Sequence, residues 1–306
     1  MSSELDLVLM TPSVEERVEI VHAEEVVVID EAAITPIRLK RKASIRFGAQ
    51  LVRDGRARAL VSAGNTGATM ICAKMVIGTS QGVDRPALAA TLPNLKGHSV
   101  LLDVGANIDC KPQHFRQFAV MGHFYAQEIV GVEEPRIGLL SIGEEEGKGS
   151  DSVKEAFKVL EEAGLNFVGN VEGGDVFSGD VDVVVCDGFV GNVLLKSAES
   201  VAGMLTMMLR EEFESGFWSR IGYLLARPSL RSFRRRIDYS EYGGAPLLGV
   251  EGGCFIAHGR SDANAIKNAV KRAVEFEEHG IAAKVSEKLR EITPPRQLPD
   301  REATPS

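Results

Sequence analysis

The stretch RIGLLSIGEEEGKGSDSVKEAFKVLEEA, residues 136–163, contains a strand, a glycine-bearing turn and a helix in succession. Residues 136–142 form a short apolar run without strict polar alternation, which is typical of a strand buried on both faces. Residues 151–163 have the spacing of an amphipathic helix, and NFVGNV (166–171) follows as a second strand. This order predicts a βαβ unit with a right-handed connection between parallel strands.

Short apolar runs and helical patterns continue to alternate along the chain. The other predicted strands are residues 5–10, 18–23, 58–64, 99–105, 181–187 and 253–259. The other predicted helices are residues 43–54, 66–77, 113–130, 192–214 and 262–279. Strands that alternate with helices indicate βαβ units, so we predict an α/β fold with a mostly parallel sheet.

The composition limits the classes of protein to which the chain can belong. With 306 residues, 44% of them hydrophobic, it can bury the core of one large domain. We place this domain at residues 1–290, followed by a loose polar, proline-rich tail at 291–306. A net charge of −8 argues against a nucleic-acid-binding protein. The four cysteines are widely spaced and match no metal-binding pattern, which indicates reduced thiols and a cytoplasmic location.

Targeting and membrane signals are not expected in this sequence. Its first residues lack the basic and apolar regions of a signal peptide. No apolar run approaches the ~18 residues that a membrane-spanning helix needs. Any contact with a membrane is therefore expected to be peripheral.

Five predicted strands are followed by turns rich in glycine, asparagine and aspartate. These turns are residues 62–67, 103–112, 141–151, 186–192 and 257–264. In a parallel sheet such turns meet at the carboxyl edge, where ligands bind. The helices that follow offer unpaired N–H groups to an anion. The turns therefore predict a site for a phosphate-bearing ligand, although such residues also occur in turns for geometric reasons alone.

Two common nucleotide-binding patterns are missing from the sequence. It contains neither a Walker A lysine motif nor a GxGxxG turn between a strand and a helix. A P-loop ATPase and an ordinary dinucleotide-dependent dehydrogenase are therefore disfavoured. Consecutive side chains seldom converge on one ion, so Glu144–Glu146 do not predict a metal site. We expect neither a metal nor an organic cofactor.

Residues 217–236, FWSRIGYLLARPSLRSFRRR, contain six arginines and no acidic residue. A helical pattern ends just before them, so we predict a helical hairpin at about residues 203–236. Its apolar and cationic side chains suit the interface of an anionic membrane. A second copy of the chain or an acidic carrier protein fits the same surface, and the sequence leaves these three partners open. The residues expected to make the contact are Trp218, Leu224, Leu225, Arg231, Arg234, Arg235 and Arg236.

The chain resembles the bacterial phosphate acyltransferases of phospholipid synthesis over about residues 18–280. The segments that carry the resemblance are VSAGNTGATM (61–70), LLDVGANIDCKPQHFRQFAVMG (101–122), IGLLSIGEEEGKGSDS (137–152), DVVVCDGFVGNVLLKSAE (182–199), DYSEYGGAPLLGV (238–250) and AHGRSDANAIKNAV (257–270). Several long motifs in one order are far more specific than a single short pattern. Family members usually begin with a glycine-rich segment that this sequence does not show.

The resemblance implies transfer of a fatty acyl group from acyl carrier protein to inorganic phosphate, which gives acyl phosphate for phospholipid synthesis. It also implies a three-layer α/β/α fold like that of isopropylmalate dehydrogenase, a homodimer, and peripheral contact with the membrane. Two alternatives stay open. One is a phosphotransacetylase-like enzyme that uses acyl-CoA, and the other is an inactive membrane-associated scaffold of lipid synthesis.

Lys148 and Asp187 are the candidate catalytic residues. The Lys148 ammonium lies between two glycines and can reach a phosphate or a developing oxyanion, although a solvated surface lysine has the same pattern. Asp187 ends an apolar run and can orient Lys148 or accept a proton, but an aspartate there also suits a helix cap. The residues expected to bind phosphate or the acyl group are Ser62, Asn65, Thr66, Gly67, Asn107, Asn192 and His258.

Overall fold

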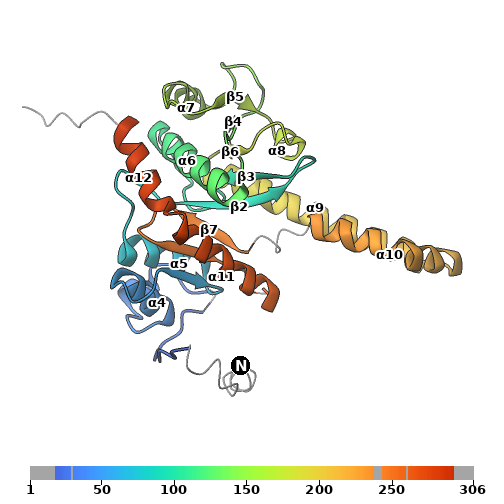
Figure 1. The fold of residues 1–306 in the computed structure, drawn as a ribbon, viewed down its shortest axis with the longest axis horizontal. Coiled ribbons are helices and arrows are strands. Elements are labelled where there is room, and N and C mark those ends of the chain that lie inside the picture. Colours follow the sequence, from blue (N-terminus) through green and yellow to red (C-terminus); the bar gives the residue numbers. More distant parts are fainter. Residues whose placement is uncertain (1–17, 29, 238–242, 260, 293–306) are drawn as a thin grey trace, which may run out of the picture.

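The computed structural model describes residues 18–28, 30–237, 243–259 and 261–292, with only the backbone described for Ser232 and residues 234–237. Eight strands within these ranges form one sheet in the order β1-β8-β7-β2-β3-β6-β4-β5 (Figure 1). The strands are β1 (Ala59–Ser62), β2 (Ala87–Pro93), β3 (His98–Leu102), β4 (Ile137–Leu140), β5 (Phe167–Val171), β6 (Val183–Val185), β7 (Ala245–Leu248) and β8 (Gly253–Ile256).

The sheet is mixed, with two groups of parallel strands that run in opposite directions. Strands β1 and β8 are parallel, and so are β3, β6, β4 and β5. The pairs β8–β7, β7–β2 and β2–β3 between the two groups are antiparallel. The expectation that all five turns meet at one carboxyl edge is therefore wrong, because three antiparallel pairs reverse the direction between β8 and β3.

Helices cover both faces of the sheet, as the predicted three-layer α/β/α architecture requires (Figure 1). Val100 and Leu102 of β3 pack against one helical layer, whereas Leu101 faces the other. The first layer contains α6 (Pro112–Tyr125), η2 (Ala126–Val130), α7 (Asp151–Glu161), α11 (Ala263–Glu278) and α12 (Ile281–Ile292). The second contains α3 (Thr35–Arg38), α4 (Ser44–Arg53), α5 (Thr66–Cys72), η1 (Ala73–Ile77), α8 (Asp175–Ser178) and the beginning of α9 (Gly188–Glu214).

The predicted strand at residues 18–23 is wrong. These residues form no strand, and Val18, Ile20 and Val21 are exposed. Strand β1 is the last strand described on that side of the sheet. The predicted strand at 5–10 lies outside the described residues, as do residues 293–306 of the predicted tail, whereas residues 291 and 292 belong to α12.

The predicted helical hairpin is confirmed. Helix α9 and helix α10 (Phe217–Ile237) are separated by Ser215 and Gly216, and together they extend beyond the sheet (Figure 1). The rings of Phe213 and Tyr223 pack with centroids 5.4 Å apart, which joins the two helices. In the described part of the chain, no helix combines the length and apolar character needed to cross a bilayer.

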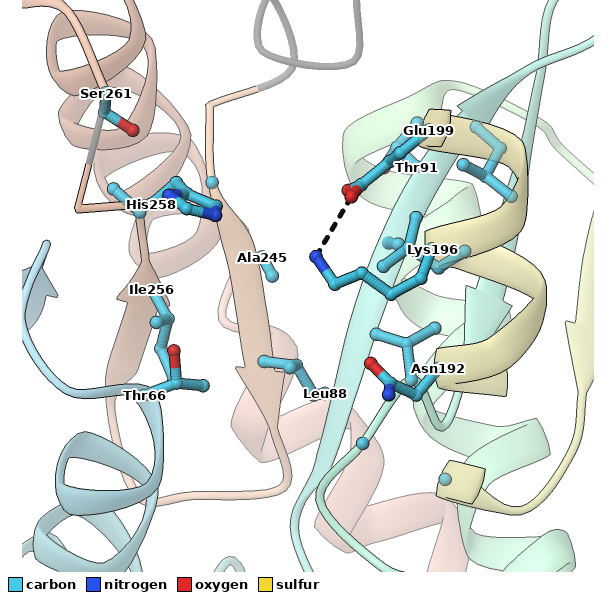
Figure 2. A pocket seen from close by; sticks show the side chains of 18 of the residues that line it. Thr66, Leu88, Thr91, Asn192, Lys196, Glu199, Ala245, Ile256, His258 and Ser261 are labelled. Atoms are coloured by element: carbon cyan, nitrogen blue, oxygen red, sulfur yellow. Dashed lines mark hydrogen bonds and ion pairs between the residues drawn. The ribbon is translucent and has the colours of Figure 1, made fainter. Parts of the chain in front are cut away.

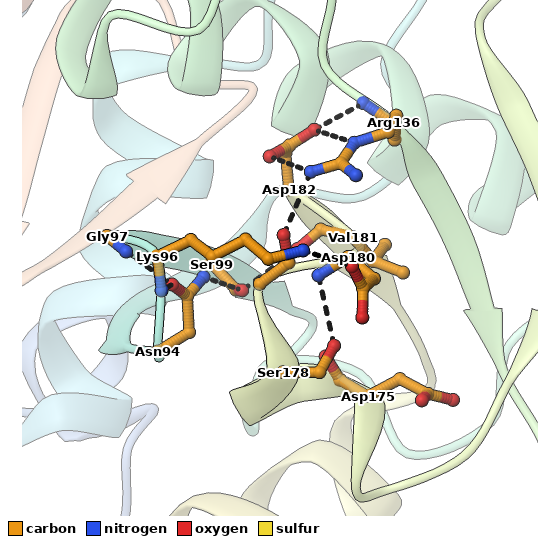
Figure 3. Close-up of polar contacts among 11 residues, drawn as sticks. Asn94, Lys96, Gly97, Ser99, Arg136, Asp175, Ser178, Asp180, Val181 and Asp182 are labelled. Carbon is orange, nitrogen blue, oxygen red and sulfur yellow. Dashed lines mark hydrogen bonds and ion pairs between the residues drawn. The ribbon is translucent and has the colours of Figure 1, made fainter.

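A polar network fixes the amino ends of β4 and β6 (Figure 3). The Asp182 carboxylate accepts hydrogen bonds from the backbone N–H of Arg136 at 2.8 Å and from its guanidinium at 2.9 and 3.0 Å. Beside it, Ser99 accepts a bond of 2.7 Å from the Asn94 amide and donates one of 3.0 Å to the Val181 carbonyl. These polar groups satisfy one another's hydrogen-bonding capacity, which indicates a structural role for this end of the sheet.

Candidate active site

A cleft of about 790 Å³ lies between α9 on one side and the amino ends of α5 and α11 on the other (Figure 2). Its floor includes Leu88 and Ala90 of β2, Ala245 of β7 and Ile256 of β8. The two alanines leave room above the sheet that larger side chains would fill. Because the cleft runs along β2 on a face of the sheet, it reaches turns from both groups of parallel strands.

One wall of the cleft is formed by the first turns of α9. Asp187 caps this helix, since its Oδ1 accepts hydrogen bonds of 2.9 Å from the N–H groups of Phe189 and Val190. Asn192 and Lys196 are four residues apart and Glu199 follows three residues later, a spacing that places them on one face of the helix. Figure 2 shows Lys196 and Glu199 extending into the cleft, opposite His258.

The turn after β3 is organised by Asp103, whose side chain is fully buried. Its carboxylate accepts five hydrogen bonds, from the N–H groups of Leu88, Gly105, Ala106 and Asn107 and from the Asn107 amide, at 2.6–3.2 Å. Burial raises the pKa of Asp103, while several of these hydrogen bonds act against that rise. The carboxylate therefore holds Gly105 in place at the edge of the cleft.

The beginning of α9 packs directly on this turn. A Cβ atom at Gly191 would lie 1.9 Å from the Asp103 carbonyl oxygen, and one at Gly188 would lie 2.7 Å from the Asn107 carbonyl oxygen. The Gly188 N–H donates to that same Asn107 carbonyl at 2.7 Å. Only glycine permits this approach, which fixes the position of the α9 wall relative to the floor.

Comparisons with known proteins identify the family. Residues 2–284 match the family model described as "Fatty acid synthesis protein". A protein of Pelotomaculum thermopropionicum named phosphate acyltransferase is 52% identical over 275 residues, which are 90% of this chain and 80% of that protein. The chain belongs to this phosphate acyltransferase family. A second member, from Acidobacterium capsulatum, is 51% identical over 86% of this chain and 78% of its own length.

The fold is also similar to that of the EutD phosphotransacetylase from Staphylococcus aureus. The two structures superpose with a TM-score of 0.53 over 91% of this chain and 84% of the other, at 16% sequence identity. At this identity the likeness concerns the fold alone. The family predicted from the sequence motifs, its α/β fold and its assignment to the acyltransferases are all confirmed.

Three of the seven predicted binding residues line the cleft. Thr66 begins α5 after β1, Asn192 lies in the second turn of α9, and His258 follows β8. They come from three segments of the chain, after β1, β6 and β8, that are far apart in the sequence. The structure thus brings together part of the set that the glycine-bearing turns predicted.

The other four predicted binding residues do not line the cleft. Three of them use their polar side-chain atoms in local contacts, and the fourth is a glycine. The Ser62 hydroxyl is buried and lies 3.0 Å from the Thr69 hydroxyl. Asn65 caps α5 through a 2.9 Å bond from the Ala68 N–H. The Asn107 amide donates to the Pro86 carbonyl and to Asp103 at 2.8 and 2.9 Å. A Cβ at Gly67 would lie 2.8 Å from the Ala33 Cβ, so this glycine allows close packing.

Lys148 and Asp187 also lie outside the residues that line the cleft. The Lys148 Nζ is 4.0 Å from Glu145 Oε2, and both side chains are exposed. Within the described residues, no hydrogen bond or ion pair joins Lys148 to Asp187, whose Oδ1 caps α9. The Ser152 hydroxyl donates to the Cys110 carbonyl at 3.1 Å, so the turn that carries Lys148 is tied to the turn after β3.

Sequence reasoning missed Lys196, Glu199 and the apolar floor. The helical spacing of Asn192, Lys196 and Glu199 was present in the sequence, but a lysine in the middle of a helix is usually a surface residue. Nothing in β2 marked it as the floor, because its sequence ALAATLP is rich in alanine. The position of α9 above β2 gives these residues their place in the site.

The described cysteines are poor candidates for a catalytic nucleophile, and the described acidic side chains are not grouped to bind a metal ion. Burial raises the pKa of Cys110 to about 12 and raises the pKa of Cys186 well above its ordinary value. Such thiols are protonated near neutral pH and are poor nucleophiles. No group of three or more His, Cys, Asp or Glu side chains within the described ranges is placed to hold a metal ion.

Proposed function

We propose that the cleft transfers a fatty acyl group from acyl carrier protein to inorganic phosphate, giving acyl phosphate for phospholipid synthesis. The observation that carries this proposal is the cleft itself, which combines an apolar floor with the cationic and polar side chains of Lys196, Asn192 and His258. The floor suits a hydrocarbon chain, and the polar wall suits an anion. The relatives named phosphate acyltransferase support acyl transfer to phosphate, and acyl carrier protein as the donor is our proposal.

The proposed reaction needs no covalent intermediate on the protein. An oxygen of hydrogen phosphate attacks the thioester carbonyl carbon, forming a C–O bond, and the C–S bond breaks with its electron pair moving to sulfur. The proton of the phosphate ends on the released thiol. Holding the two reactants together supplies a large part of the rate increase, and a donor placed at the oxyanion supplies about 3–4 kcal/mol more.

Lys148 and Asp187 remain our proposed catalytic pair. Asp187 directly precedes Gly188, which lines the cleft. Ser152, shortly after Lys148, donates a hydrogen bond to the turn after β3. The separation of 4.0 Å between Lys148 and Glu145 is long for an ion pair, so this carboxylate holds the exposed ammonium only loosely. Asp187 begins the helix that carries the cleft wall. The remaining proposed binding residues act indirectly, by shaping the turns beside the cleft.

The proposed reaction predicts acyl phosphate as the product. Hydroxylamine converts acyl phosphate to a hydroxamate, so we expect hydroxamate when the protein is incubated with phosphate and acyl carrier thioester, and much less with acyl-CoA. Lys148→Ala and Asp187→Asn are each expected to lower the rate by about a hundredfold without unfolding the protein. Product from CoA alone would support the phosphotransacetylase-like alternative. No product from either donor would support the inactive scaffold.

We also propose a homodimer formed through α9. Val201, Met204, Leu205 and Met208 are half or more exposed in this chain. Their spacing of three and four residues makes an apolar stripe along the helix. An uncovered stripe of this kind on a helix that extends from the sheet suits a second copy of the chain.

Helix α10 supports our proposal of peripheral membrane contact. Trp218, Leu224 and Leu225 are 80%, 64% and 80% exposed, and Arg231 is exposed on the same helix. The side chains of Arg234, Arg235 and Arg236 lie outside the described residues, although their backbone belongs to α10. Exposed aromatic and arginine side chains suit the interface of an anionic membrane. The protein would then be cytoplasmic and reversibly membrane-bound.

Sedimentation with lipid vesicles tests the membrane proposal. The protein is expected to pellet with vesicles that contain anionic lipid and to stay in solution with neutral vesicles. Changing Trp218, Leu224 and Leu225 together to Asp is expected to abolish pelleting. Hydroxamate formation by this variant then shows whether the same surface also binds the carrier protein. Equal pelleting of the variant and the unmodified protein would reject the membrane role. The basic surface would then be left to the carrier protein or to the dimer.

A further inference from the structure

Lys196 is the single lysine or arginine among the described residues that line the cleft. It lies in the third turn of α9, and its side chain is 55% exposed. Two acidic side chains, Glu199 and Asp262, also line the cleft and repel an anion that enters it. Among the described lining residues, Lys196 therefore offers the strongest attraction to a phosphate that enters the cleft.

The Lys196 ammonium is held by one carboxylate. Its Nζ donates to Glu199 Oε2 at 2.9 Å, and the Glu199 side chain is only 20% exposed. An ammonium has three N–H donors, and Glu199 uses one of them. The other donors are available to a ligand in the cleft, and the Asn192 amide lies one helical turn away on the same wall.

We infer that Lys196 binds the substrate phosphate directly and that Glu199 is a positioning residue that holds the Lys196 ammonium over the cleft. This inference rests on the proposed function, because it assigns the phosphate subsite of the same cleft. Thr66 and His258 lie on the opposite wall, so a phosphate bound at Lys196 faces a polar surface across the apolar floor.

Glu199 affects phosphate in two opposite ways. It fixes a long, flexible lysine side chain, which reduces the entropy lost when phosphate binds. Its negative charge also repels phosphate and acyl phosphate, which keeps binding weak and lets the product leave. Glutamine at this position can still accept the hydrogen bond from Lys196 but carries no charge. Glu199→Gln therefore separates the two effects.

Binding of inorganic phosphate to the full chain, without an acyl donor, tests the inference. Titration calorimetry or ³¹P line broadening gives the Kd for phosphate. We expect Lys196→Gln to weaken binding by about tenfold or more, and Glu199→Gln to tighten it by about threefold. Glutamine suits a helix nearly as well as lysine, so the fold should be kept, and unchanged thermal melting checks this.

Lys154→Gln provides the matched control. Lys154 belongs to a similarly spaced pair with Asp151 on α7, outside the residues that line the cleft. This variant should bind phosphate as the unmodified protein does. The inference is overturned if Lys196→Gln binds phosphate normally, if the unmodified protein does not bind phosphate, or if Glu199→Gln weakens binding as a merely structural residue would.

The same variants distinguish this inference from the proposed function. Hydroxamate formation by Lys196→Gln with an unchanged KM for phosphate would refute the subsite and leave the function standing. Phosphate binding that depends on Lys196, in a protein that makes no acyl phosphate, would refute the function and leave the subsite standing. The phosphate subsite and the proposed function are both supported if Lys196→Gln raises the KM for phosphate and the Kd for phosphate by similar factors.

Discussion

Gly191→Ala is expected to lower the free energy of unfolding by about 3 kcal/mol and to abolish most of the activity. The new Cβ would lie 1.9 Å from the Asp103 carbonyl oxygen and 2.8 Å from Cys186 Sγ. A contact with backbone at 1.9 Å cannot be relieved by a side-chain rotation. The beginning of α9 must move away from the turn after β3, which displaces the wall that carries Asn192 and Lys196.

The control for this prediction lies in the same helix. Gly203 has no atom within 4 Å of the position where a Cβ would be placed. Gly203→Ala should therefore raise the free energy of unfolding by about 0.5 kcal/mol through helix propensity alone. Urea unfolding and the hydroxamate assay measure the two effects. Similar stability and activity in both variants would show that the close packing of α9 on the turn is not needed.

Asp103→Ala is expected to lower the free energy of unfolding by about 4 kcal/mol. The substitution removes the acceptor of five hydrogen bonds and leaves buried N–H groups of the turn without partners. Each unpaired buried donor costs about 1–3 kcal/mol, and water that enters the vacated space recovers part of this. The turn would also release Gly105 at the edge of the cleft, so phosphate binding should weaken.

Asp103→Asn shows whether charge and acceptor capacity matter more than volume. The asparagine amide has nearly the same shape, but its NH₂ group must face N–H donors in either orientation. We expect a loss of stability almost as large as that of Asp103→Ala, measured by urea unfolding. Asp109→Asn, on the exposed part of the same turn, should change stability by less than about 0.5 kcal/mol. Near-normal stability of Asp103→Asn would contradict the role assigned to the carboxylate.

The sequence predicted most strands and helices because short apolar runs and amphipathic patterns reflect burial. It did not predict β2 or β7, and this omission changed the topology. β2 is rich in alanine and ends at Pro93, and β7 contains four residues, so neither shows the pattern of a buried β-branched strand. Without them, the opposite directions of the two parallel groups could not be inferred.

The prediction of the site was incomplete for a related reason. Polar residues in glycine-bearing turns were chosen as ligands, but Ser62, Asn65 and Asn107 use their polar atoms to stabilise those turns. Spacing in the sequence does not show whether a polar atom already has a partner. Conversely, the place of Lys196 in the site depends on α9 and β2 lining the same cleft, although the two elements are far apart in the sequence.

Acyl transfer to inorganic phosphate is decided by measuring whether acyl phosphate forms together with free thiol. The full chain is incubated with acyl carrier thioester and phosphate, and the released thiol and the acyl phosphate ³¹P signal are measured together. We predict equal amounts of both, no thiol release without phosphate, and a rate that saturates with phosphate at a concentration raised by Lys196→Gln. Thiol release that does not depend on phosphate, or no release at all, would contradict the account.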